Sequence, residues 1–311
     1  MGWNFADELQ RWGPQSPGLA NPGLSHARSY CASVTHRHYE NFTVASVLLP
    51  RKLLPHFHAV YAYCRWADDL ADETAGGDST LALLDWWRHE LLAVYNGQPR
   101  HPVMIALRET VQKFAIPPAP FLNLLTAFEQ DQRKKTYATF DELLGYCRNS
   151  ANPVGELVLY QFECHDAERA ALSDEVCTGL QLANFWQDVG RDLDIGRVYL
   201  PEEDRRRFGY ADEDLHARRF TPAFAELMRF EVDRTRDYFE RGKRLLPLIP
   251  RQVRIDVDLF IRGGEATLAA VERQGYDVWK QRPKVSKWQK VKLLGRALTS
   301  SVSAAWQSPG G

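Results

Sequence analysis

Two short acidic segments are the part of this sequence best suited to chemistry. They occupy residues 68–72 (DDLAD) and 188–192 (DVGRD), about 120 positions apart in the chain. In each segment the outer two aspartates are four residues apart, so on a helix both carboxylates project from the same side. Carboxylate oxygens are the ligands that Mg²⁺ takes, usually one or two from the protein, with the rest from water and substrate phosphate. The segments therefore predict a magnesium site for diphosphate chemistry.

Each acidic segment belongs to a longer polar stripe. The first stripe carries a phenol, a guanidinium and two carboxylates, from Tyr61, Arg65, Asp68 and Asp72. The second carries two amides and two carboxylates, from Gln181, Asn184, Asp188 and Asp192. A polar stripe on a buried helix is costly unless something pairs with it, and cations would pair with these groups. A solvated face with salt bridges explains one such stripe well, but it explains two with apolar flanks poorly.

The composition indicates a globular protein and excludes several functional classes. The chain has 311 residues, of which 44% are hydrophobic, and its net charge of −1 argues against a nucleic-acid partner. The five cysteines include no CxxC pair and are expected to be reduced core thiols of a cytoplasmic protein. No signal-peptide pattern begins the chain, and no apolar run approaches the roughly 18–20 residues that cross a bilayer.

Helical periodicity covers most of the chain, so the elements that position the stripes are helices. We expect an all-α bundle of about ten helices, because β-alternating stretches are scarce and no linker or repeat interrupts the pattern. The predicted helices with the clearest signals span 55–73, 79–96, 101–115, 117–135, 139–149, 153–163, 173–194, 221–246 and 251–275. The prediction is a single domain over residues 1–311.

The segments around both stripes resemble the squalene/phytoene synthases, a family with the all-α isoprenoid synthase fold. That resemblance implies a single helical bundle around a central cavity, with a core over about residues 30–295. The most specific matches are 61–72 (YAYCRWADDLAD) and 181–192 (QLANFWQDVGRD), the latter continuing into 196–201 (GRVYLP). Weaker matches lie at 146–155 (YCRNSANPVG) and 275–278 (GYDV).

Within that family the sequence is most similar to the hydroxysqualene synthase branch of bacterial hopanoid biosynthesis. Residues 40–46 (ENFTVAS) resemble the N-terminal segment of that branch, and 150–155 reads SANPVG where relatives commonly have VAGxVG. Gln187 stands where most relatives have an arginine. These departures imply that presqualene diphosphate and water give hydroxysqualene and diphosphate. The alternative is head-to-head condensation of two prenyl diphosphates, from farnesyl diphosphate to presqualene diphosphate or squalene, or from geranylgeranyl diphosphate to phytoene.

The resemblance also implies roles for individual residues. Three Mg²⁺ ions would be held with the diphosphate by Asp68, Asp72, Asn184, Asp188 and Asp192. Arg65 would bind phosphate oxygens, and the substrate would also contact Ser46 and Gln181. An aromatic pocket for the carbocation would include Phe42, Tyr61, Tyr146 and Phe185, of which Tyr61 and Tyr146 join the four aspartates as candidate catalytic residues. Asn152 and Gln187 would help to hold the attacking water, and no NADPH is expected for this reaction.

Two other classes of function are open from the residues alone. A non-catalytic helical binding protein would leave both acidic stripes unexplained. A cyclising terpene synthase would share the fold and metal, but it normally carries a DDxxD segment and an NSE-type second site. Magnesium-dependent release of diphosphate from presqualene or farnesyl diphosphate would separate an enzyme from a binding protein.

The basic segment at 279–296 carries a separate expectation. It contains seven Lys and Arg residues, no acid, and interspersed Trp and Leu. Such a segment either contacts an anionic membrane peripherally or forms a solvated basic helix end, and both interpretations are open.

Overall fold

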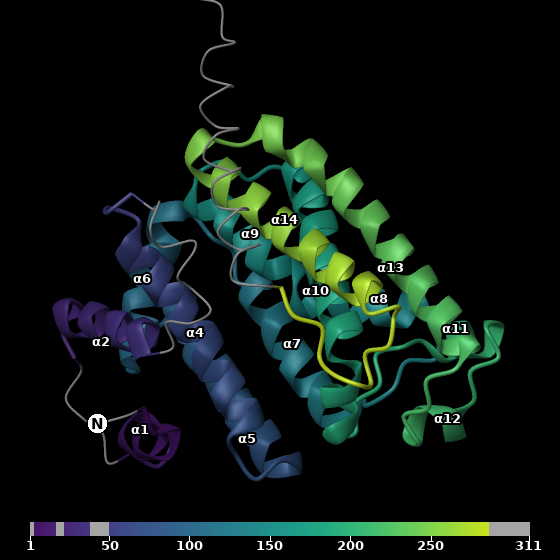
Figure 1. Cartoon of the computed structure of the whole chain (residues 1–311). Coiled ribbons are helices and arrows are strands. Elements are labelled where there is room, and N and C mark those ends of the chain that lie inside the picture. The colour runs from purple at the N-terminus through teal and green to yellow at the C-terminus, as the bar shows by residue number, and fades with distance from the viewer. Residues whose placement is uncertain (1–2, 17–21, 38–49, 286–311) are drawn as a thin grey trace, which may run out of the picture. The chain divides into compact units, whose positions relative to one another are not determined.

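The described chain is built from helices joined by short loops (Figure 1). The computed structural model describes residues 3–16, 22–37 and 50–285. Within these ranges the only β-type pairing is an isolated bridge between Thr136 and Val198. The all-α prediction is therefore confirmed. Among the described helices, none has the length and apolar character needed to cross a membrane.

The chain forms two compact units. Unit 1 consists of Met1–Arg133 and Glu156–His165, and unit 2 of Lys134–Gly155 and Asp166–Gly311. The continuous helix α9 (Asn152–Gln161) begins in unit 2 and ends in unit 1. The prediction of a single domain stays a prediction.

Unit 1 is organised around the helix that carries the first acidic stripe. Its helices are α1 (Phe5–Trp12), α2 (Leu24–Arg37), α4 (Leu54–Asp72), α5 (Gly77–Asn96), α6 (Pro102–Phe114), α7 (Ala119–Arg133) and the C-terminal part of α9. The central helix is α4, because it contacts α2, α5, α6 and α7.

Aromatic side chains fill the interior of unit 1 around α4. Trp66 of α4 stacks on Trp87 of α5 with ring centroids 5.3 Å apart, and both side chains are fully buried. The His101 ring meets the Trp66 ring edge-on at 4.4 Å, and burial lowers the pKa of this histidine well below its ordinary value. These tryptophans serve core packing, and their contacts hold α4 in a fixed orientation within the unit.

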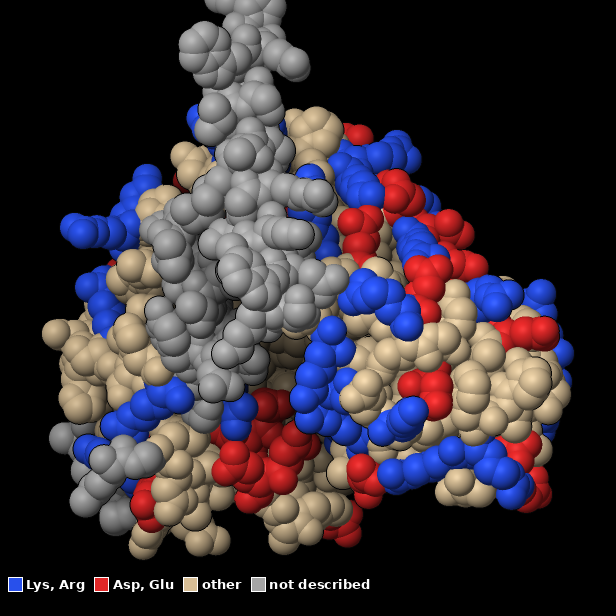
Figure 2. Space-filling view, in the orientation of Figure 1, with Lys and Arg blue, Asp and Glu red and all other residues tan. Residues whose placement is uncertain are grey.

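Unit 2 is organised around the helix that carries the second stripe. Its elements are α8 (Phe140–Ser150), the start of α9, α10 (Ala167–Asp194), α11 (Glu202–Arg207), α12 (Asp212–His216), α13 (Pro222–Gly242), the 3₁₀ helix η1 (Lys243–Leu248) and α14 (Arg251–Arg273). The central helix is α10, which contacts α8, α13, α14 and η1. Figure 2 shows basic and acidic side chains alternating over α13, where Arg236 pairs with Asp233 at 2.7 Å and with Glu272 at 2.6 Å.

The long helix α10 begins earlier than the sequence predicts. The predicted start was near Ser173, but the helix starts at Ala167, because the Asp166 side chain accepts a hydrogen bond from the Arg169 amide at 2.8 Å and caps it. The helix predicted to reach residue 246 ends at Gly242 and tightens into η1, which contains Pro247. The sequence did not predict helices α1, α2, α11 and α12.

Candidate active site

The first acidic stripe lies on α4 and presents its carboxylates to different degrees. Asp72 is exposed and the Asp68 side chain is 42% exposed, whereas the adjacent Asp69 is fully buried. Arg65 Nη1 lies 3.1 Å from Asp68 Oδ2. One turn before Arg65, Tyr61 is half-buried, and this burial raises the pKa of its phenol. The structure therefore places all four predicted residues of this stripe along one helix of unit 1.

Asp69 is a buried carboxylate that the sequence interpretation did not assign. It pairs with Arg65 Nη2 and accepts a hydrogen bond from Trp3 Nε1 at 3.2 Å. Burial raises the pKa of Asp69 to about 7, although the Arg65 guanidinium opposes that shift. Arg65 also lies 3.2 Å from Glu73 Oε1. The guanidinium predicted to bind phosphate is thus shared among two carboxylates of its own helix and that of Glu73, which directly follows the helix.

The second stripe lies on α10, in unit 2. Asn184 is exposed, while Gln181, Asp188 and Asp192 are half-buried. At 100° per residue these four side chains fall on one side of the helix, as predicted. The structure therefore assembles the second stripe within unit 2, and the joint grip of both stripes on metal ions stays a prediction.

Asp188 is held by an arginine from the segment that follows α14. Arg282 Nε lies 2.5 Å from Asp188 Oδ1, and Arg282 Nη2 donates to Asp188 Oδ2 at 2.8 Å. The same Nη2 donates to Gln187 Oε1 at 2.7 Å, and Gln187 Nε2 donates to the Pro283 carbonyl at 2.7 Å. Both polar atoms of the Gln187 amide are therefore engaged by residues 282–283. The predicted part of Gln187 in holding the attacking water stays a prediction.

A buried aromatic cluster adjoins the second stripe. Phe185 of α10 stacks on Tyr199 at a centroid distance of 3.9 Å, and Tyr146 of α8 lies 6.1 Å from Phe185 and 5.7 Å from Tyr199. Tyr137 stacks on Tyr199 at 5.8 Å. The structure thus brings the predicted residues Tyr146 and Phe185 together. Tyr137 and Tyr199 complete the cluster and were missed, although Tyr199 lies in the recognised GRVYLP segment.

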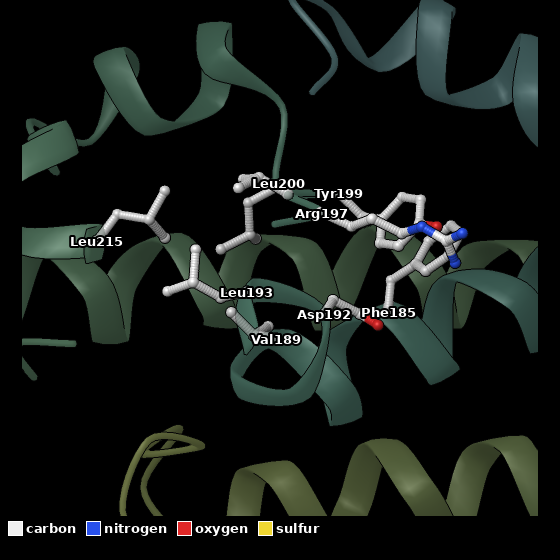
Figure 3. A pocket seen from close by; sticks show the side chains of 9 residues that line it. Phe185, Val189, Asp192, Leu193, Arg197, Tyr199, Leu200 and Leu215 are labelled. Atoms are coloured by element: carbon white, nitrogen blue, oxygen red, sulfur yellow. The ribbon is translucent and has the colours of Figure 1, made fainter. Parts of the chain in front are cut away.

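A small pocket lies beside this cluster. Figure 3 shows Val189, Leu193, Leu200 and Leu215 at its apolar end, with Asp192 toward the other end. Phe185 and Tyr199 of the aromatic cluster also line it. A predicted metal ligand, Asp192, therefore borders apolar and aromatic surface.

The predicted water-binding residues are not brought together. Asn152 is buried, and its Oδ1 accepts a hydrogen bond from Thr178 Oγ1 of α10 at 3.0 Å. Nine residues separate Thr178 from Gln187 on α10, a rise of about 13 Å with the two side chains on opposite sides of the helix. Asn152 and Gln187 therefore occupy separate surroundings. The predicted substrate contacts Phe42 and Ser46 lie outside the described residues.

The donor set of both stripes fits magnesium. Within the described ranges, no three His, Cys, Asp or Glu side chains already gather into a metal cage. Mg²⁺ does not require one, because it usually takes one or two protein carboxylates and completes its shell with water and phosphate oxygens. The Asp188 carboxylate already binds a cation through both oxygens, that of Arg282, so this site is built to hold positive charge.

Comparison with known proteins identifies the family of this chain. The model of the family described as squalene/phytoene synthase matches residues 35–289. The chain belongs to the squalene/phytoene synthase family. The fold prediction is also confirmed, because solved structures of the isoprenoid synthase fold superpose on the chain with TM-scores near 0.8.

Individual members of the family differ in their likeness to this chain. The solved squalene synthase HpnC from Alicyclobacillus acidocaldarius is 46% identical, with a TM-score of 0.79, covering 81% of this chain and 95% of its own. A dehydrosqualene synthase solved in complex with ligand is 29% identical, with a TM-score of 0.80, covering 90% and 98%. The 15-cis-phytoene synthase of Synechocystis sp. (strain ATCC 27184 / PCC 6803 / Kazusa) is 30% identical, covering 90% of this chain and 88% of that protein.

Proposed function

We propose that this family member converts presqualene diphosphate and water into hydroxysqualene and diphosphate. The carrying observation is the aromatic cluster of Tyr137, Tyr146, Phe185 and Tyr199 beside an acidic stripe on the same unit. Such an arrangement suits a substrate whose diphosphate is charged and whose remainder is apolar. The 46% identity to the squalene synthase HpnC, against 30% to the Synechocystis phytoene synthase, supports the squalene side of the family.

The proposed reaction begins with loss of diphosphate. The carbon–oxygen bond breaks, its electron pair leaves with the diphosphate, and a cyclopropylcarbinyl cation remains. Bound Mg²⁺ supplies Lewis-acid stabilisation of the departing charge. Asp68 and Asp72 from α4, with Asn184, Asp188 and Asp192 from α10, are the proposed ligands.

The later steps depend on the aromatic cluster. The aromatic rings of the cluster keep bulk water away from the cation, and a ring face that the cation reaches, such as that of Tyr146, stabilises it by about 0.5–2 kcal/mol. The cation rearranges and a carbon–carbon bond of its cyclopropane ring breaks as one water forms the new carbon–oxygen bond. The proton of that water passes to the released diphosphate. The proposed reaction consumes no reductant, so NADPH takes no part in it.

The decisive experiment supplies the purified protein with Mg²⁺, presqualene diphosphate and H₂¹⁸O. The expected product in the lipid extract is hydroxysqualene carrying one ¹⁸O, identified by mass spectrometry. Squalene or a rearranged hydrocarbon without label would contradict the proposal.

Parallel incubations test the alternative that the phytoene synthase relatives favour. In these, farnesyl or geranylgeranyl diphosphate replaces presqualene diphosphate. A faster conversion of either to presqualene diphosphate, squalene or phytoene would identify the protein as a head-to-head condensing enzyme.

We also propose peripheral membrane contact through residues 279–296, most of which lie outside the described residues. The described part contributes exposed Lys280 and Lys284, whereas Arg282 pairs with Asp188 and Trp279 packs on Phe224 at 5.2 Å. Co-sedimentation with anionic vesicles should fall as salt rises, because the attraction is electrostatic. Binding that is absent at low salt would end this part of the proposal.

A further inference from the structure

The contact between Arg282 and Asp188 has features that a surface ion pair lacks. The guanidinium fork meets both carboxylate oxygens, at 2.5 and 2.8 Å, which is the bidentate geometry of strong charge-assisted pairs. The side chains are only 32% and 21% exposed. The hydrogen bonds to Asp188 raise the pKa of Arg282, and the nearby charge of Asp192 raises it further.

A third side chain fixes the arginine in this position. The Gln187 amide accepts from Arg282 and donates to the carbonyl of Pro283, so one buried amide fastens two consecutive residues. A glutamine can do this because its amide carries both an acceptor and donors. An arginine at position 187 has no acceptor and would repel Arg282.

A second arginine near Asp188 provides a natural comparison. Arg191 Nε lies 3.9 Å from Asp188 Oδ1, and its side chain is 68% exposed. Arg191 carries the same charge close to the same carboxylate. It does not form a bidentate contact with Asp188, and it is much more exposed to solvent. Its effect on cation binding at Asp188 is therefore expected to be small.

We propose that Arg282 is a positioning residue that occupies both oxygens of Asp188 in the metal-free protein, so that a divalent cation must displace it to bind there. This inference rests on the proposed function, since it takes Asp188 to be a metal ligand. It assigns to residues 282–283 a role that their place in a basic tail did not suggest. The group that the metal ion displaces is the Arg282 guanidinium, which belongs to the chain itself. Its hydrogen bond to Gln187 sets how readily Arg282 leaves Asp188.

The test measures Mn²⁺ binding to the full-length protein without substrate, by the electron paramagnetic resonance signal of the free ion. Wild type, Arg282→Gln and Arg191→Gln are compared, with Asp188→Asn marking the binding that depends on this carboxylate. Arg282→Gln should tighten Asp188-dependent binding about 10-fold or more, because bidentate charged hydrogen bonds no longer compete. Arg191→Gln should change it by about twofold or less.

A further measurement and a second variant distinguish competition with the metal ion from a purely structural role of Arg282. Thermal unfolding in EDTA reports whether Arg282→Gln has loosened the fold, and a purely structural arginine would lower the melting temperature without tightening Mn²⁺ binding. If Arg282→Gln fails to fold, Arg282→Lys replaces it, and the loss of the fork should give a smaller tightening in the same direction.

Unchanged or weaker Mn²⁺ binding in the Arg282 variant, or equal changes in both arginine variants, would overturn the inference. The ¹⁸O product experiment is independent of this outcome. Labelled hydroxysqualene together with unchanged Mn²⁺ affinity would leave the proposed function standing and remove only the competition by Arg282.

Discussion

Asp68 and Asp69 are neighbours in sequence that the fold places in opposite surroundings. Asp68 is 42% exposed, whereas Asp69 is fully buried between Arg65 and Trp3. Helical spacing distinguishes the two positions, because only Asp68 lies on the same side of the helix as Asp72. The sequence did not indicate that Asp69 would be paired with Arg65, since that requires knowing which face of α4 is covered.

Asparagine substitutions should separate stability from metal binding in this pair. Asp69→Asn should lower the free energy of unfolding by about 2 kcal/mol, because one of the two buried oxygens that face the donors of Arg65 and Trp3 becomes an amide NH₂, which cannot accept a hydrogen bond. Asp68→Asn should change stability by less than about 0.5 kcal/mol but lower magnesium-dependent turnover about 100-fold or more. Urea unfolding and steady-state kinetics check the two effects. Equal losses of stability in both variants would contradict this division.

Asp256 of α14 makes the stability depend on pH. Its carboxyl is buried, which raises its pKa from 3.8 to about 7. The folded state then binds more protons than the unfolded state between these values, so stability falls as pH rises through this interval. The slope from this group approaches about 1.4 kcal/mol per pH unit. Urea unfolding at pH 5, 6 and 7 should show this slope flattened in Asp256→Asn, and an identical slope in wild type and variant would refute the assignment.

At the residue scale, the acidic stripes could be predicted from the sequence because both follow a strict helical spacing. Tyr146 and Phe185, two of the four predicted pocket aromatics, lie 6.1 Å apart, and their contact with the carbocation stays a prediction. The pairing of Arg282 with Asp188 was not predicted, because a basic residue in a basic tail gives no signal of a partner 94 positions away. Gln187 was noticed as unusual, but its partners follow only from tertiary structure.

At the scale of elements, one aromatic ring sets the spacing of helices in unit 2. Phe239 of α13 is fully buried and packs against Gly179 of α10, where an added Cβ would lie 3.0 Å from the ring. A Cβ at Gly264 of α14 would overlap the same ring. The two glycines thus let three helices approach around one phenylalanine.

The adjacent glycines of α14 give a matched pair of variants. Gly264→Ala should destabilise unit 2 by about 1–3 kcal/mol, because the Phe239 ring must shift in a packed core. Gly263→Ala meets no atom within 4 Å and should stabilise the helix by about 0.5–1 kcal/mol. Thermal unfolding of both variants checks the opposite signs. Destabilisation by both substitutions would show that the space beside Gly263 is not open.

Most long helices could be predicted because their apolar periodicity and their glycine and proline breaks agree. The start of α10 was wrong because Ser173-Asp174-Glu175 has the composition of a helix start, whereas the actual cap is Asp166. Ser173 is instead buried beside Gly155, where an added Cβ would overlap its hydroxyl. Local sequence cannot distinguish these two starts when both carry capping residues.

At the scale of the whole molecule, each unit supplies one acidic stripe on its central helix. The proposed function requires both stripes to act on one cluster of ions, so variants in different units should not behave independently. Asp68→Asn and Asp192→Asn should each lower kcat/KM about 100-fold or more, and the double variant should lose much less than the product of the two losses. Kinetics with saturating Mg²⁺ measure the coupling. Fully multiplicative losses would indicate two separate sites.

The path of the chain through α9 constrains the order in which the protein folds. Leu157 is buried in the core of unit 1, and Phe162 contacts Phe57 with ring centroids 5.8 Å apart. These residues are synthesised only after Lys134–Gly155, which belongs to unit 2. A nascent chain stopped at residue 133 therefore lacks part of its own interior, and the ribosome must release residues of the second unit before the first can close. Unit 1 can therefore close only after residue 165 has emerged, with Lys134–Gly155 of unit 2 already outside the ribosome.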